Sequence, residues 1–451
     1  MKPKNIRHQL FLLLLFTGQL LLAQQKDTSS YTFSLKQCVD YALQHNTNVM
    51  NARLDEVAAR DKVMEITGIG LPQINSSFQI QDFVEIPTSL IPAVIFGGPP
   101  GTYIPVQFGT RYNATASVSA SQLLFSGSYI YGLKGSKVYQ ELAQKNTTRT
   151  NIETSAEVTK AYYTALVNVE RKKLLDANVV RLKKLRDDTK ALYEAGFVEK
   201  IDLDRINVAF NNLQTEVANV QRLFDLSIVL LKYQMGMDQS AKLSLSGKLE
   251  DISFQPEIQP AGAFNYSSRI EYQLFELQLK GKQLMLKSER AGYLPTLALF
   301  GSVQAQAQRQ EFDFFAKKRW YPIGIIGFQF SMPIFDGLQR HYRVQQAKVG
   351  IMKAENDMLF MQRTIDMQQA ITRVNLQNSS ASLEAQKANM ELAQSVYDVA
   401  KKKYDQGVGS NLEVINAETS LKEAQTNYFN ALYDAVVAKV EYDKAMGKYQ
   451  N

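Results

Sequence analysis

The chain has 451 residues, with 51 Lys and Arg against 44 Asp and Glu, one Cys and three His. Its formal charge of +7 falls to +4 without the basic residues at positions 2, 4 and 7, and this mild excess gives no indication of nucleic-acid binding. A single Cys excludes an internal disulfide, and His residues without neighbouring ligands argue against a metal site.

The first residues have the pattern of a secretory signal peptide. Three basic residues precede an apolar run over 10–22 that is broken only by Thr17, Gly18 and Gln19, and the small residue Ala23 follows it. A run of roughly 13 residues is too short to cross a bilayer core of about 30 Å. We therefore predict a signal peptide over 1–23. No Cys lies at the cleavage point to carry a lipid anchor.

Two segments with period-two alternation come next, over about 73–84 and 110–124. Apolar residues such as Phe78 and Val118 share one face, and uncharged polar residues occupy the other. This pattern resembles outer-membrane barrel strands, and a soluble half-buried sheet is the alternative. The Pro-rich segment 83–108 between them is expected to be an exposed tip.

Very long helices follow the strands. The tract 128–195 lacks Pro, and Gly196 separates it from a second helical segment over 201–235. A fully helical tract of this length would extend roughly 100 Å, more than a globular domain can hold. Its apolar residues recur at helical spacing and predict a packed stripe: Val158, Ala161, Tyr162, Ala165 and Leu166.

The same order of elements then returns. Strands are predicted over about 296–308 and 321–334, and helices over 338–406 and 412–446. The segment Phe312–Trp320 is expected to be a second exposed tip. A further packed stripe is predicted from Leu392, Val396, Val399 and Ala400. Four aromatic residues that flank the strands could form a girdle against outer-membrane lipid: Tyr103, Phe108, Trp320 and Tyr321.

These elements form an internal repeat. The offset is 223 residues between Asn46 and Arg269 but 210 between Phe125 and Phe335, so the first copy has 13 extra residues in its hairpin. We predict a first repeat over 24–255 and a second over 256–451.

The number of strands constrains the assembly. Four strands from one chain would leave unpaired edges in a bilayer. Eight strands from a dimer would close, but side chains would nearly fill the interior. Three chains supply about twelve strands around a possible lumen. The smallest assembly that both closes and conducts is therefore a homotrimer.

The two-fold repeat, the hairpins after Leu71-Pro72 and Leu294-Pro295, and the helical turns at Gly196 and Gly407 resemble the TolC-like outer-membrane factor family, the outer membrane efflux proteins. The resemblance implies an α+β membrane protein of the cell outer membrane. In it, a trimeric 12-stranded β-barrel, with four strands per chain, is continuous with a long periplasmic α-helical barrel. It also implies an exit duct for small molecules, with a periplasmic adaptor (membrane fusion) protein and an inner-membrane pump as partners.

The resemblance further implies a channel constriction just after the helical turns. The matching acidic positions are Asp202 and Glu413, where carboxylates from three chains would repel one another and attract cations. Asn416 and Arg205 occupy the positions three residues on, and an Asp202–Arg205 ion pair would weaken the constriction. The alternative is that both acids are first-turn residues favoured by the helix dipole.

The turns themselves are the expected adaptor contacts. They comprise Gly196, Phe197 and Val198 in the first copy, and Gly407, Val408, Gly409 and Ser410 in the second. Small residues there would permit close contact between helix ends, although they could also serve only to make the turn.

The sequence has no recognisable motif for an enzymatic function. No phosphate-binding loop and no nucleophile with its base and orienting group can be recognised, so we expect neither an enzyme nor a bound cofactor. A type I protein secretion duct and a non-channel periplasmic coiled-coil scaffold remain as alternatives. The sequence does not name the transported molecule.

Overall fold

The structure is a computed structural model that describes residues 30–247, 249, 254 and 264–450. Contacts divide the chain into two compact units. The first unit comprises residues 1–53, 146–271 and 361–451, and the second comprises residues 54–145 and 272–360. Each unit thus takes segments from both predicted repeats. The signal peptide and the repeat boundary at 255/256 lie outside the described residues, so both stay predictions.

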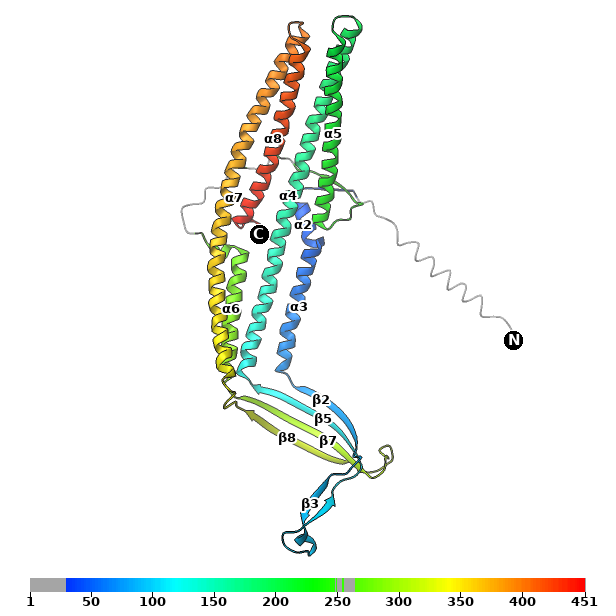
Figure 1. Ribbon diagram of the computed structural model, residues 1–451, viewed down its shortest axis with the longest axis vertical. Helices are drawn as coiled ribbons and strands as arrows, with labels where there is room; N and C mark the ends of the chain where they lie inside the picture. Colours follow the sequence, from blue (N-terminus) through cyan, green and yellow to red (C-terminus); the bar gives the residue numbers. More distant parts are fainter. Residues whose placement is uncertain (1–29, 248, 250–253, 255–263, 451) are drawn as a thin grey trace, which may run out of the picture. The chain divides into compact units, whose positions relative to one another are not determined.

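Helices form most of the first unit (Figure 1). The helices of the chain are α2 Leu35–His45, α3 Thr47–Ile69, α4 Gly127–Glu194, α5 Lys200–Met235, α6 Ile270–Ala291, α7 Gln339–Asp405 and α8 Asn411–Ala445. Short 3₁₀ turns are η1 Ala93–Phe96, η3 Tyr266–Ser268 and η4 Lys448–Gln450. The four longest helices begin and end within one residue of the predicted bounds. None of the helices in the described part of the chain combines the length and apolarity needed to cross a membrane.

Short-range hydrogen bonds explain where the long helices begin. The hydroxyl of Ser126 accepts from the backbone N–H of Tyr129, and the carboxylate of Asp336 accepts from that of Arg340. Ser126 and Asp336 are equivalent in the repeat. Each satisfies one of the free N–H groups in the first turn of its helix, α4 or α7.

The apolar core of the first unit has two main clusters. One buries α2 against α4 and α5, and it includes Cys38, whose pKa burial raises to about 12. The other joins α4, α5, α7 and α8 around Leu185, Ile206 and Leu421. The first predicted stripe, Val158 to Leu166, is buried and therefore confirmed as core.

The second predicted stripe is packed within the chain only at Ala400, which is half-buried against the second cluster, so that prediction was wrong in part for the single protomer. Leu392, Val396 and Val399 on α7 are 66%, 51% and 53% exposed. The helical spacing identified an apolar face correctly, but α7 turns its buried positions, such as Leu376 and Tyr397, toward α4 and α8 instead.

Asn46 and Arg269 make equivalent contacts in the two halves of the first unit. The amide of Asn46 donates to the carbonyl oxygen of Gln234 at 2.7 Å. The guanidinium of Arg269 donates to the carbonyl oxygen of Ala445, also at 2.7 Å. Gln234 and Ala445 are 211 residues apart and lie at the ends of α5 and α8. The repeat in sequence thus corresponds to a repeat in hydrogen bonding.

The second unit contains a four-stranded antiparallel sheet with the order β2-β5-β7-β8. Its strands are β2 Gln73–Asp82, β5 Tyr112–Phe125, β7 Thr296–Arg309 and β8 Tyr321–Ser331. In addition, β3 Thr88–Pro92 pairs with β4 Tyr103–Gln107. A parallel pair, β1 Ser30–Phe33 with β6 Lys242–Leu245, belongs to the first unit.

The register gives the sheet one apolar face. Phe78 pairs with Ala116, and Ala116 pairs with Ala305, so these residues share a side. Val303 and Phe328 lie on the same side and are 67% and 70% exposed. Apolar side chains this exposed on a sheet require a hydrophobic surrounding, as the alternation predicts.

The two hairpin connections of the sheet differ from each other. The 83–108 segment forms the β3–β4 hairpin and is largely exposed, as predicted. The Phe312–Trp320 segment was also predicted to be an exposed tip, and this was wrong in part. Phe314 is buried against Ala114 and Ala307 on the apolar sheet face. Two small residues paired across β5 and β7 leave room there for an aromatic ring.

Candidate functional site

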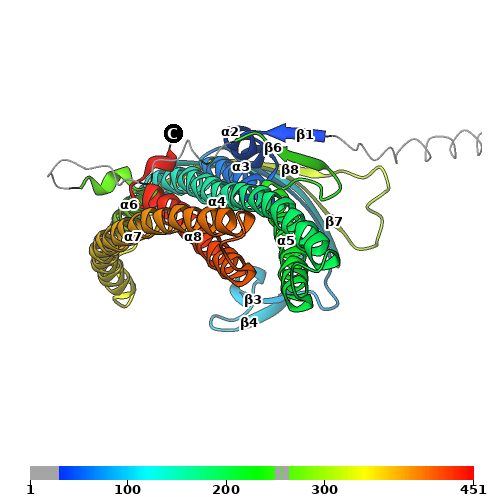
Figure 2. The same ribbon diagram turned by 90° about the horizontal axis from the view of Figure 1, so that it is seen from above.

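The turns between the long helices have the same geometry in both copies. Gly196 and Gly407 have φ angles of +80° and +74°. The N–H of the next residue, Phe197 or Val408, donates back to the helix at 2.9 or 3.0 Å, to the carbonyl oxygens of Leu192 and Lys403. A left-handed glycine with this bond ends a helix sharply. Figure 2 shows both turns from above.

Each turn presents one large apolar side chain. Phe197 is 79% exposed and Val408 is 77% exposed. Val198 is half-buried, and Gly409 packs so closely that a Cβ atom would lie 2.9 Å from that of Lys403. Ser410 accepts a hydrogen bond from the N–H of Glu413 at 3.2 Å and so caps α8. The residues predicted to contact an adaptor therefore include some that chiefly shape the turn.

Asp202 is paired in the structure. Arg205 Nη1 lies 3.5 Å from Asp202 Oδ1, so the ion pair expected from the sequence is present. The Asp202 side chain is 24% exposed, and it lies in the first turn of α5. Part of its negative charge is therefore neutralised locally, and Asp202 is the weaker of the two candidate acids.

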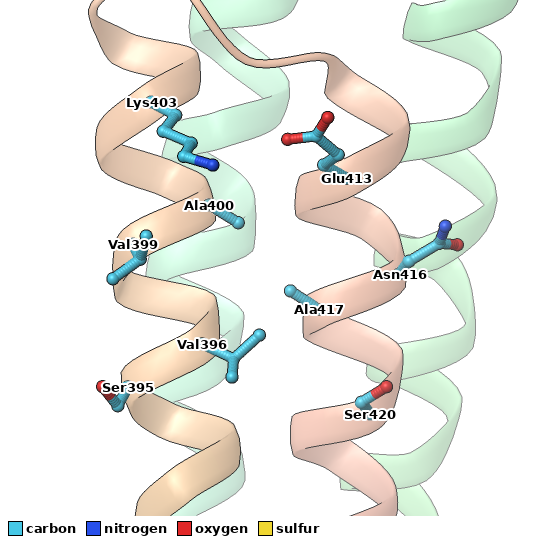
Figure 3. Close-up of a pocket in the computed structure, with 9 residues that line it drawn as sticks. All are labelled: Ser395, Val396, Val399, Ala400, Lys403, Glu413, Asn416, Ala417 and Ser420. Carbon is cyan, nitrogen blue, oxygen red and sulfur yellow. The ribbon is translucent and has the colours of Figure 1, made fainter.

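Glu413 and Asn416 line a groove of about 510 Å³ between α7 and α8. Lys403 and Glu413 reach into this groove from facing helices (Figure 3). Its walls are small or apolar: Val396, Val399, Ala400 and Ala417, with Ser395 and Ser420 at one end. Asp202 and Arg205 are not among the lining residues. The groove is thus lined by Glu413 and Asn416 but not by Asp202 or Arg205.

One hydrogen bond joins the two candidate regions. The side-chain amide of Asn411, at the start of α8, donates to the backbone carbonyl oxygen of Asp202 at 2.9 Å. Asn411 is 5% exposed, so this bond is shielded from water. It connects the first turns of α5 and α8 and thereby couples the two helical hairpins near their tips.

A buried polar cluster lies further along the same helices. Asn178 donates to Gln425 at 2.6 Å, and Arg181 donates to Gln394 at 3.2 Å, so α4 is bonded to both α8 and α7. Glu418 is 7% exposed, and its Oε2 atom accepts no hydrogen bond from the described residues. An acidic group here is costly because its charge has lost its hydration.

The environment of Glu418 favours its neutral form. Burial raises the pKa of Glu418, and the positive charges of Arg181 on α4 and Lys422 on α8 oppose this only partly. On α7, burial together with the Glu418 carboxylate raises the pKa of Tyr397 to about 12. Because the folded-state pKa of Glu418 is raised, the protonated side chain contributes to the stability of the fold at low pH. This contribution is lost as the pH rises through the folded-state pKa.

We predict that Glu418→Gln flattens the dependence of thermal stability on pH. The variant should melt above the wild type at neutral pH, and in a chain of this length a gain of about 1 kcal/mol corresponds to roughly 1–2 °C. Circular dichroism melting between acid and neutral pH would measure this. Glu423→Gln on the exposed side of α8 is the matched control. Identical profiles for all three proteins would contradict the assignment.

Sequence reasoning missed Lys403, Asn411 and Glu418. Glu418 had a signal, because it continues the buried helical spacing of Val414 and Leu421 and is therefore an acid at a core position. No signal in the sequence marks Lys403 or Asn411, because their roles depend on which helices lie beside them.

Comparison with known proteins agrees with this architecture. The family model "Outer membrane efflux protein" matches residues 275–448. The probable efflux pump outer membrane protein TtgC of Pseudomonas putida is 23% identical over 353 residues, which cover 75% of this chain and 69% of TtgC. The outer membrane protein TolC of Salmonella enteritidis is 22% identical over 356 residues, covering 75% of this chain and 70% of TolC.

The fold is also that of a solved outer membrane protein. VceC from Vibrio cholerae superimposes with a TM-score of 0.69 at 15% identity, over 92% of this chain and 96% of VceC. Residues 275–448 thus match the outer membrane efflux protein family, and the whole chain has the fold of a solved outer membrane protein. The family match, the relatives and the fold together support an outer-membrane efflux channel whose helical part lies in the periplasm.

Proposed function

We propose that this chain is the exit duct of a tripartite efflux system, in which three copies form one passive channel for small molecules such as drugs or other toxic compounds. Channels of this family are trimers that work with efflux systems. TtgC is named as an efflux pump component, which supports the same role here. In this proposal the energy comes from an inner-membrane pump, and the channel carries out no covalent chemistry.

The observation that carries the proposal is the open sheet of the second unit. Its edge strands, β2 and β8, have no further partner among the described strands, and its apolar face is exposed. In a bilayer, unpaired strand edges are prohibitively costly, so the edges must pair with other copies. Three copies give twelve strands, enough to surround a lumen.

The exposed stripe on α7 supports the same assembly. Leu392, Val396 and Val399 face outward in the protomer, and the last two line the α7–α8 groove. Apolar side chains at helical spacing are normally covered in a stable assembly. In the trimer we propose, helices of a neighbouring copy cover this stripe.

We place the constriction at the first turns of α8 and α5, with Glu413 and Asn416 as its principal groups and Asp202 and Arg205 as a weaker, partly neutralised pair. Glu413 is exposed on the groove, whereas Asp202 is paired with Arg205. The bond from Asn411 to the Asp202 carbonyl would hold the closed state, because it ties both hairpins together.

The helical turns are the adaptor-docking surface in this proposal. Phe197 and Val408 offer an exposed apolar side chain from each hairpin, so a trimer would present six such contacts. Exposed apolar residues at a tip are typical of sites that a partner covers.

Currents in planar bilayers test the channel and its constriction together. Three carboxylates about 10 Å from a passing cation contribute on the order of 1 kcal/mol in water, which corresponds to a several-fold preference for cations. Glu413→Gln should remove most of this preference for cations, and Asp202→Asn should remove a smaller part of it. The control Glu423→Gln should leave the preference unchanged. The reversal potential in a salt gradient measures the effect.

The outcomes separate the parts of the proposal. The absence of any conductance from the wild-type protein would favour the scaffold alternative. Normal conductance with unchanged selectivity in Glu413→Gln would refute the constriction only. Co-purification with an adaptor and a pump, rather than with a protein-secretion transporter, would decide between small-molecule efflux and type I secretion. Loss of that complex in a Phe197→Ser/Val408→Ser variant would locate the docking surface.

A further inference from the structure

The β7–β8 connection folds over the apolar sheet face instead of extending away from it. Phe314 is 7% exposed and covers Ala114 and Ala307, with Trp320 packed against it at a ring distance of 6.4 Å. Phe312 stacks edge-on with both Tyr112 and Phe314, at 5.7 and 5.5 Å. The connection is therefore a built structure seated on the surface that faces lipid.

The outer side of this segment has two kinds of exposed group. Phe315 is 91% exposed and Phe312 is 56% exposed. Three cations follow directly, Lys317, Lys318 and Arg319, and all are exposed. Aromatic side chains next to Lys and Arg are typical of the boundary between hydrocarbon and headgroups, where the cation reaches polar groups while its stem stays in the apolar layer.

Only some of these cations are used within the protein. Lys318 pairs with Asp313, which is also bonded to Arg309, so this set holds the segment in shape. Arg319 lies over the Tyr321 ring at 5.6 Å, an arrangement that leaves its donors available. Lys317 has no ion pair within the described residues. Lys317 and Arg319 therefore direct positive charge to the surroundings from one short segment, and the exposed carboxylate of Glu311 offsets part of it.

The chain order places this segment at the outer end of the strands. All four strands join helices at one end, and the helical part lies in the periplasm, so the hairpin connections lie on the opposite side of the membrane. The β2–β5 connection at the same end has no such charge, because Glu85 is the only charged residue in 83–108. The cationic segment is specific to one hairpin.

We propose that residues 310–320 form a lipid clasp that binds the phosphate groups of anionic lipids in the outer leaflet. Phe312 and Phe315 enter the acyl layer, while Lys317 and Arg319 contact phosphate. This inference rests on the outer-membrane location of the channel. Charge complementarity selects anionic over zwitterionic lipid, because each basic residue near an anionic surface favours binding by about fivefold.

Trp320 makes the inference directly measurable, because it is the only tryptophan in the chain. The full-length trimer would be reconstituted into phosphatidylcholine–phosphatidylglycerol vesicles with bromine on one lipid at a time. Bromine quenches tryptophan fluorescence only at close range, so the ratio of quenching by the two lipids gives their relative affinity beside Trp320. We expect phosphatidylglycerol to be favoured by about five- to 25-fold in the wild type.

Lys317→Gln/Arg319→Gln should reduce the ratio of quenching by phosphatidylglycerol to quenching by phosphatidylcholine to about one. The Lys318–Asp313 pair is retained in this variant and keeps the segment folded. Lys317→Arg/Arg319→Lys should retain the preference for phosphatidylglycerol. Lys183→Gln/Lys184→Gln on exposed positions of α4 removes the same charge elsewhere and should change nothing. Equal quenching by both lipids in the wild type, or an undiminished preference in the first variant, would overturn the clasp. Conductance of the same vesicles reports separately on the channel.

Discussion

Replacing Gly236 with alanine should destabilise the first unit by about 3–5 kcal/mol, combining a left-handed residue with an overpacked site. Gly236 ends α5 with a φ of +70°. A Cβ atom there would lie 2.3 Å from the carbonyl oxygen of His45 and 3.0 Å from the Asn46 Cα atom. These are backbone atoms at the end of α2, so they cannot rotate away. Urea unfolding followed by far-UV circular dichroism would measure the loss.

Gly196→Ala is the matched control for this experiment. Gly196 also ends a helix, with a φ of +80°, but an added Cβ would meet nothing within 4 Å. Its cost should be limited to the left-handed conformation, about 1–2 kcal/mol. The difference between the two variants isolates the close approach of α5 to α2. Equal losses would show that this approach does not contribute.

Arg269→Ala should cost a similar amount, about 3–5 kcal/mol, because it breaks a buried ionic network. Arg269 is 4% exposed and donates to Glu271 at 3.0 Å, to Gln368 at 3.2 Å and to the carbonyl oxygen of Ala445. Burial alone would raise the pKa of Glu271, but the hydrogen bond and charge of Arg269 outweigh it and lower that pKa. Thermal melting of the detergent-solubilised protein would measure the effect.

A second substitution tests the reason for this cost. In Arg269→Ala the Glu271 carboxylate is left without its cation, so Arg269→Ala/Glu271→Gln should recover part of the stability. Arg149→Ala removes an exposed arginine whose partner, Glu153, lies 3.8 Å away, and should cost less than about 1 kcal/mol. No recovery in the double variant would mean that lost packing, rather than the unpaired charge, dominates. In the wild type, the lowered pKa of Glu271 stabilises the fold above its unfolded pKa, and this contribution is lost on acidification.

The sequence was sufficient for the four long helices and the four main strands of the fold. The Pro-free tracts and the glycine between each pair of them predicted both ends of the four long helices to within one residue. Glycine marks the turn because it adopts the left-handed conformation that the turn requires. Alternation gave the four main strands and their apolar face, since side chains of a strand point to opposite sides. The repeat in the sequence matched Asn46 with Arg269. The structure then showed that both side chains donate to a backbone carbonyl oxygen near the end of a long helix.

The candidate site was predicted only in part. Asp202, Glu413 and the turn residues were found from their places in the chain, and the Asp202–Arg205 pair followed from helical spacing. The groove lined by Lys403 and Glu413 could not be predicted, because it depends on the distance between α7 and α8. The buried state of Glu418 likewise depends on α4 and α7 packing over it.

The sequence by itself determined the repeated order of elements, the approximate bounds of the four long helices and the four main strands, and which faces are apolar. These features depend on local backbone preferences and on spacing along the chain. Only the tertiary structure decided what each apolar face meets. The stripe at Val158 is buried, the stripe at Val396 faces outward, and the segment around Phe314 folds over the sheet. Spacing identifies a face, but burial depends on which segments, distant in sequence, are brought against it.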